Sequence, residues 1–200
     1  MGFGFLFIGF MLLYDYEIVL AADGVGYLAL DIFPDVLGFL LLFLGLRKLC
    51  RKGEDFAFLK KASLFLLPLS VLMLVKGTLL FPAFYDAATG KMGLAATALD
   101  VCMRLLKLAF TYLLFQKTAA MAFRLGEPKL SSHHGLIPRI AMVDGVLYLA
   151  STALRTFAPQ SLLTLTSTVT ILELLFWVLL VWFGAICLFR CVLRLSDLSE

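Results

Sequence analysis

Residues 35–52 read DVLGFLLLFLGLRKLCRK: one acid, eleven uncharged residues, and then four bases within six positions. The acids that precede this stretch, Asp15, Glu17, Asp23 and Asp31, have no Lys or Arg among them. Multi-pass membrane proteins keep Lys and Arg on the cytoplasmic side of their spans. The stretch therefore predicts a membrane-crossing helix with its acidic end outside and its basic end in the cytoplasm.

The composition agrees with this interpretation. The chain is 62% hydrophobic and 16% charged, with a mean hydropathy of +1.00. Soluble domains are about 45–50% apolar and about 25% charged, so an ordinary soluble fold is excluded. The net charge of +3 is modest and the bases flank apolar stretches, so we expect membrane lipid rather than nucleic acid as a partner.

Six apolar stretches predict an all-α integral membrane bundle of six transmembrane helices, arranged as three hairpins in a single polytopic domain over residues 1–200. Twelve of the 17 bases lie at one set of connections, which places both termini in the cytoplasm. The first stretch lacks the basic region and cleavage site of a secretory signal, so we expect it to be retained as an anchor. Residues 116–136 have the composition of a loop. The expected spans are residues 2–20, 35–49, 62–81, 94–115, 137–157 and 163–189.

Several spans carry polar residues every three or four positions, so that these residues share one helix face. Ionisable residues at the centre of a span cost about 2.5–3.5 kcal/mol each on insertion scales, so such faces should avoid lipid. The second span has a small-residue face below its acidic end. These faces comprise Asp31, Asp35, Gly38, Leu42 and Gly45; Thr97, Asp100, Arg104, Lys107 and Thr111; Asp144, Tyr148, Ser151 and Arg155; and Thr166, Thr170, Glu173 and Trp177.

The charges inside the spans allow two interpretations. Asp100 and Arg104 are four residues apart and can pair within one helix, whereas Glu173 needs a partner from another helix, for which we expect Arg104 or Lys107. The charged residues either line a water-accessible pocket in the outer half of the bilayer, suited to an anionic or zwitterionic ligand, or form a structural network that fixes helix register. The candidate ligand-binding residues are Asp31, Asp35, Lys76, Asp100, Arg104, Lys107, Arg155 and Glu173.

A weak internal repeat bears on this choice. Asp31, Asp100 and Glu173 each lie 17 residues before a base, a rise of about 25 Å along a helix. Three parallel hairpin repeats, as in some transporters, would produce this spacing. The topology alone, with acids outside and bases inside, would produce it too.

Other residue types indicate no chemistry. Cys50, Cys102, Cys187 and Cys191 lie in or beside apolar runs without zinc-ligand spacing, and are interpreted as small apolar residues; Cys187 and Cys191 share one helix face. His133-His134 are expected in a solvated loop. No hydrolase, metalloprotease or phosphate-loop signature occurs, so we assign no catalytic residue, metal or cofactor. An intramembrane enzyme that uses Asp100 or Glu173 as an acid or base stays an alternative.

The N-terminal fifth shows a resemblance. Gly4-Phe5-Leu6-Phe7-Ile8-Gly9-Phe10, followed by Leu30-Asp31-Ile32-Phe33-Pro34-Asp35 and Leu37-Gly38-Phe39, resembles a group of small multi-pass membrane proteins of Gram-positive bacteria that have no assigned activity. The resemblance covers roughly 40 residues. It implies a location in the bacterial cytoplasmic membrane and implies no chemistry.

We expect a small-solute transporter or a ligand-binding membrane protein. The alternative is a structural or regulatory membrane subunit whose charged helix faces pack against a partner protein. A homo-oligomer is compatible with either function.

Overall fold

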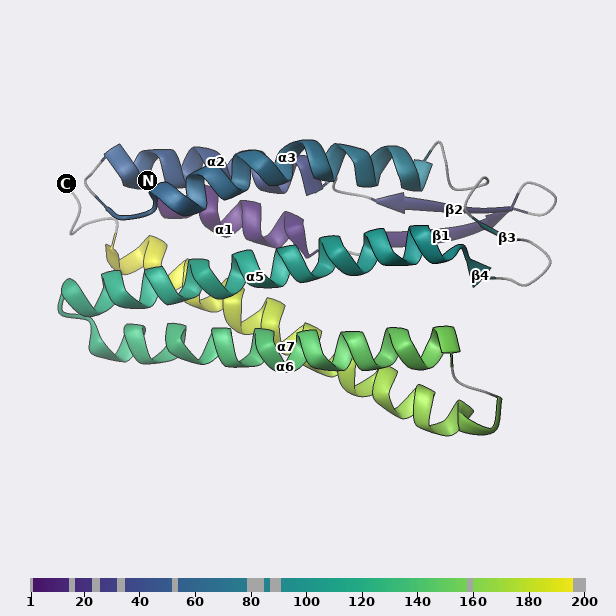
Figure 1. Cartoon of the computed structure of the whole chain (residues 1–200). Helices are drawn as coiled ribbons and strands as arrows, with labels where there is room; N and C mark the ends of the chain where they lie inside the picture. The colour runs from purple at the N-terminus through teal and green to yellow at the C-terminus, as the bar shows by residue number, and fades with distance from the viewer. Residues whose placement is uncertain are drawn as a thin grey trace. The chain divides into compact units, whose positions relative to one another are not determined.

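The computed structural model describes residues 2–14, 17–22, 26–31, 35–51, 54–78, 85–86, 91–157 and 160–195. This part of the chain forms six α-helices, one short 3-10 helix and two antiparallel β-hairpins (Figure 1). In chain order the elements are α1 (Gly2–Leu13), β1 (Glu17–Ala22), β2 (Gly26–Asp31), α2 (Asp35–Arg51), α3 (Ala57–Thr78), β3 (Tyr85–Asp86), β4 (Lys91–Met92), α5 (Leu94–Arg124), α6 (Pro128–Phe157), η1 (Gln160–Leu162) and α7 (Leu163–Leu195).

Within the described residues, three helices are long and apolar enough to cross a membrane: Ala57–Lys76, which is most of α3, together with α6 and Leu163–Arg194 of α7. A span needs about 20 residues, and α1 and α2 have only 12 and 17. The 31 residues of α5 are long enough but include several charges. The three helices support a membrane location, and the count of six spans stays a prediction.

The first expected span, residues 2–20, is wrong in its second half. Helix α1 ends at Leu13, and β1 pairs antiparallel with β2 from Glu17↔Asp31 to Ala22↔Gly26. The β-branched residues Ile18 and Val19 favour a strand over a helix. The all-α expectation therefore holds for the six long elements and fails at this connection and at the short β3–β4 pair.

The expected loop over residues 116–136 is also wrong, because only three residues separate α5 from α6. Gly126 adopts a φ of 80°, its N–H bonds to the Phe123 carbonyl (3.1 Å), and the Glu127 N–H bonds to the Ala122 carbonyl (3.0 Å). These two bonds are the Schellman motif that ends a helix at a glycine. Pro128 then occupies the first turn of α6, where its missing N–H costs nothing.

The chain divides into two compact units, residues 1–106 and residues 107–200, with the boundary inside α5. In the first unit α2 packs against both α1 and α3, and the β1–β2 hairpin contacts α3. In the second unit α6 and α7 form a long helical hairpin. The single membrane domain over the whole chain stays a prediction.

Glycines set the distance between α1 and α2. A Cβ on Gly9 would lie 2.8 Å from the Gly38 carbonyl oxygen, and one on Gly45 would lie 2.9 Å from the Gly2 carbonyl oxygen. Gly2 and Gly9 are seven residues apart on α1, and Gly38 and Gly45 are seven residues apart on α2. The two antiparallel backbones therefore approach each other closely at two successive points. The small-faced character expected of the second span is confirmed. Of the three glycines of the first span that the sequence suggests as close-packing positions, Gly2 and Gly9 pack closely, whereas Gly4 does not.

We expect Gly9→Ala to lower the stability of the folded protein by about 1–3 kcal/mol, since the added methyl group meets a backbone atom that cannot move aside. Gly4→Ala is the matched control, because a Cβ at Gly4 has no atom within 4 Å. The control should be neutral or slightly stabilising, as alanine is the better helix former. Unfolding of detergent-purified variants measures both. Equal losses for the two would refute the close helix contact.

Candidate functional site: polar clusters between apolar helices

The eight candidate ligand-binding residues fall in both units. Asp35 is buried at the start of α2. Asp31 ends β2, and its side chain lies outside the described part of the structure. Lys107 is half-buried in the part of α5 that belongs to the second unit. A single pocket that joins all eight stays a prediction, and the clusters are described here within each unit.

In the first unit, Lys76 near the end of α3 forms an ion pair with Asp100 of α5. The lysine side chain is 6% exposed and the carboxylate is 33% exposed. The Lys76 ammonium also donates to the Ala96 carbonyl at 3.3 Å, one turn before Asp100. The carboxylate that we expected to pair within its own helix therefore has a partner on another helix.

Arg104, one turn after Asp100, lies over an aromatic ring. Its guanidinium carbon is 5.8 Å from the ring centre of Tyr14, which is itself buried. A cation over the face of a ring is attracted by the ring quadrupole, and the attraction grows as water is excluded. The aromatic ring thus helps to accommodate a charge that an apolar helix would otherwise carry at a cost.

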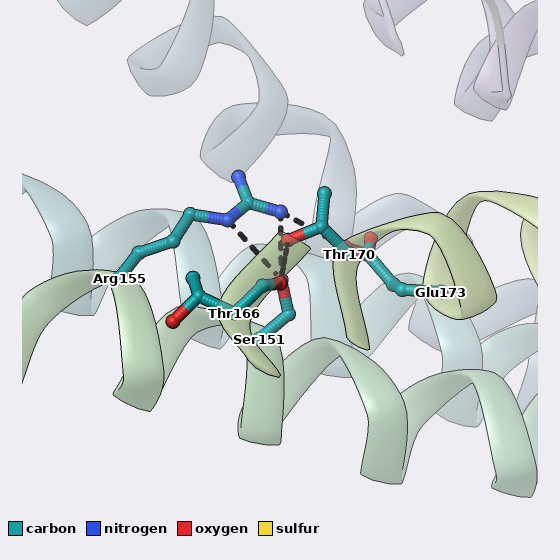
Figure 2. Close-up of polar contacts among 5 residues, drawn as sticks. All are labelled: Ser151, Arg155, Thr166, Thr170 and Glu173. Atoms are coloured by element: carbon teal, nitrogen blue, oxygen red, sulfur yellow. Dashed lines mark hydrogen bonds and ion pairs between the residues drawn. The ribbon is translucent and has the colours of Figure 1, made fainter. Parts of the chain in front are cut away.

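In the second unit, four residues of α6 and α7 form the cluster that we call the Arg155 cluster: Ser151, Arg155, Thr170 and Glu173 (Figure 2). Arg155 donates from Nε and Nη2 to the Ser151 hydroxyl (3.1 and 2.7 Å) and from Nη2 to Glu173 Oε2 (3.1 Å). Ser151 also lies 3.2 Å from the Thr170 hydroxyl. The structure therefore gives Glu173 the partner Arg155, where the sequence analysis expected Arg104 or Lys107.

The hydrogen bonds of the Arg155 cluster form a chain in which each group donates to the next, from Arg155 to Ser151 and then to Thr170. A guanidinium only donates, so the Ser151 oxygen accepts from Arg155 and its own proton is available for Thr170. The Thr170 hydroxyl in turn donates to the Thr166 carbonyl at 2.9 Å. Each hydroxyl is thereby used as donor and as acceptor, which holds the guanidinium in one orientation.

Exposure differs sharply within the Arg155 cluster. Ser151 is fully buried, the Glu173 side chain is 14% exposed, and the Arg155 side chain is 53% exposed. In Figure 2 the other terminal nitrogen of the guanidinium points away from the contacts with Ser151 and Glu173. One edge of a positive group is therefore fixed to the protein, and the opposite edge faces outward.

A second cluster of the same unit, the His134 cluster, joins three helices. Nδ1 of His134 lies 2.8 Å from the Thr118 hydroxyl of α5, and Nε2 lies 3.3 Å from both the Cys187 carbonyl and Cys191 Sγ of α7. Thr118, His134 and Cys191 are fully buried. Both ring nitrogens therefore have hydrogen-bond partners in the interior of the unit.

The expectation of a solvated loop for His134 is wrong, because α6 starts at Pro128, just after the Schellman turn at Gly126 and six residues before His134. The signal was the spacing of His134, Ile137, Ala141 and Asp144, which extends the polar face of the fifth span backward at intervals of three and four. All four are buried. The shared face of Cys187 and Cys191 is confirmed, since they lie four residues apart on α7 and both are buried.

We expect His134→Gln to lower the stability by about 1–3 kcal/mol, because glutamine cannot supply two opposed ring nitrogens and leaves buried polar groups without partners. His133 is the matched control, since it is the same residue type at the next position and is exposed. His133→Gln should stay within about 0.5 kcal/mol of the wild type. Chemical unfolding in detergent measures both, and equal effects would contradict a tertiary role for His134.

No family model, curated protein sequence or solved structure matches the chain. The functional interpretation therefore rests on the contacts, burial and charges of the clusters described above.

Proposed function

We propose that the chain is a six-span protein of the bacterial cytoplasmic membrane that binds or transports a small anionic or zwitterionic solute. Both termini lie in the cytoplasm, and the Arg155 cluster holds the solute in the outer half of the bilayer. The membrane location is supported by the three long apolar helices and by the large apolar side chains exposed along them. Val146 of α6 and Ile171 and Trp182 of α7 are each at least 66% exposed. Such surface suits contact with lipid.

Six crossings are supported by the arrangement of charges and by the length of α5. Lys48 and Arg51 lie in the last turn of α2, and Asp35 lies in its first turn. Helix α5 has 31 residues, a length of about 46 Å, which exceeds the hydrocarbon core even though the helix carries charges. Helix α1 is only about 18 Å long. To complete its crossing, either the bilayer becomes thinner around it or the residues next to the helix in the sequence span the remaining distance.

The observation that carries the functional proposal is the direction of the Arg155 side chain. Arg155 lies two residues before the end of α6. Arginines near the end of a membrane helix ordinarily extend toward the lipid headgroups. Arg155 instead contacts Ser151, one turn back along the helix, and Glu173, which is in the third turn of α7. A guanidinium that is held by Ser151 and Glu173 along one edge and exposed along the other is suited to bind a carboxylate or phosphate.

The alternative is a structural or regulatory subunit whose charged faces pack against a partner protein. Either function is compatible with a homo-oligomer. Stable co-purification of a second membrane protein, with no response to small solutes, would favour this alternative over the proposed function.

Thermal unfolding of detergent-purified protein with acetate, inorganic phosphate or glycine tests the proposal. At least one of these probes should raise the midpoint in a concentration-dependent way, by an amount equivalent to about 2.7 kcal/mol at one hundred times its Kd. Arg155→Gln should abolish the response. Arg194→Gln is the matched control, because Arg194 also pairs with a glutamate (Glu127, 3.0 Å) and is also largely exposed. No response to any probe, or equal responses in both variants, would refute the proposal.

A further inference from the structure

The Arg155 cluster places a carboxylate beside the position that a bound anion would take. Glu173 Oε2 is 3.1 Å from Arg155 Nη2, on the guanidinium whose outer edge faces outward. An anion that binds the same guanidinium brings a second negative charge close to Glu173, and two negative charges that share a site disfavour each other's ionisation. One guanidinium would then have to balance two negative charges.

Burial makes this conflict costly. The Glu173 side chain is only 14% exposed, so water screens it poorly. Arg155 also donates to the neutral hydroxyl of Ser151, which in turn contacts the neutral hydroxyl of Thr170. A second negative charge therefore finds no further cation in the Arg155 cluster, and the charge has to be balanced by a proton.

We propose that anion binding at Arg155 is coupled to the uptake of one proton by Glu173. The proton comes from solution and forms an O–H bond on the carboxylate, and the anion binds the outward-facing edge of the guanidinium. This linkage rests on the proposed solute binding. In transport, the proton would be the ion that moves together with the solute. By linkage, a lower pH tightens anion binding, and a bound anion favours protonated Glu173 to the same extent.

The ionisable groups around Arg155 indicate that Glu173 is the one that takes up the proton. Between Leu163 and Phe189, Glu173 is the sole acid or base in the sequence of α7, and η1 contains neither. From α6, Arg155 faces Glu173, and its guanidinium acts only as a hydrogen-bond donor. The next ionisable groups on the polar face of α6 are Tyr148 and the buried Asp144, which lie about 10 Å and about 16 Å along the helix from Arg155.

The pH dependence of acetate binding tests the coupling. Between about pH 6 and about pH 8 acetate stays ionised, so a change in its Kd reports protonation of the protein. For the wild type we expect Kd to rise with pH, with a limiting slope of about tenfold per pH unit for one linked proton. Glu173→Gln, which resembles the protonated acid, should bind acetate with an affinity independent of pH and tighter than the wild type at the upper end of this range.

Glu127→Gln is the matched control for Glu173→Gln. Glu127 also pairs with an arginine through Oε2 in the same unit, and its removal should leave the pH slope intact. A flat wild-type profile would overturn the coupling while leaving the proposed function in place, and it does not depend on whether any variant folds. A slope that persists in Glu173→Gln, or failure of acetate to bind while phosphate or glycine does, would also overturn it. If no probe binds, the proposed function itself fails.

Discussion

Polar side chains on apolar helices have to find their partners on neighbouring helices, and this requirement organises both units of the structure. An isolated charge at the centre of a membrane helix costs about 2.5–3.5 kcal/mol on insertion scales. Lys76 of α3 meets Asp100 of α5, and Arg155 of α6 meets Glu173 of α7. His134 applies the same principle to a neutral ring, which bonds to groups of α5 and α7. Each contact offsets the cost of a polar group and fixes which helix faces which.

Close packing of the backbones complements these polar contacts. Apolar side chains gain little by leaving lipid for another apolar surface, so helices in a membrane associate through close approach and specific contacts. The glycine pairs Gly9–Gly38 and Gly2–Gly45 supply the close approach between α1 and α2. The first unit thus combines tight backbone contact at one helix pair with an ion pair at another. The second unit relies on the Arg155 cluster and the His134 cluster between α5, α6 and α7.

Sequence periodicity predicted which faces of the helices are polar, and the structure confirms several of them. Helices α2 and α7 begin at the expected residues, Asp35 and Leu163. On the predicted faces Ser151 is buried and Glu173 is largely shielded. Such a pattern specifies a face because side chains three and four residues apart stack on one side of a helix. It does not specify which residue lies opposite, which is why the partner of Glu173 was predicted wrongly.

The other errors of prediction have local causes. Residues 116–136 contain Gly126, Pro128 and Gly135, which together resemble a loop, although only Gly126 adopts a conformation that a helix excludes. The remaining residues continue two helices, and His134 is therefore interior. The β1–β2 hairpin follows an apolar helix, and its first strand is itself apolar from Ile18 to Ala22, so composition alone extended that helix too far. The sequence predicted the charged residues of the candidate site. It did not predict their division into separate clusters, because that division depends on tertiary contacts.

The charges on these helices are stabilised by one another, and a double-mutant cycle on Lys76 and Asp100 tests this claim most directly. Asp100→Asn should destabilise more than Lys76→Met, because the ammonium it leaves behind is 6% exposed whereas the carboxylate is 33% exposed. The double variant should be more stable than Asp100→Asn alone, with a coupling energy of about 0.5–3 kcal/mol in chemical unfolding. Additive losses with no recovery in the double variant would contradict the account.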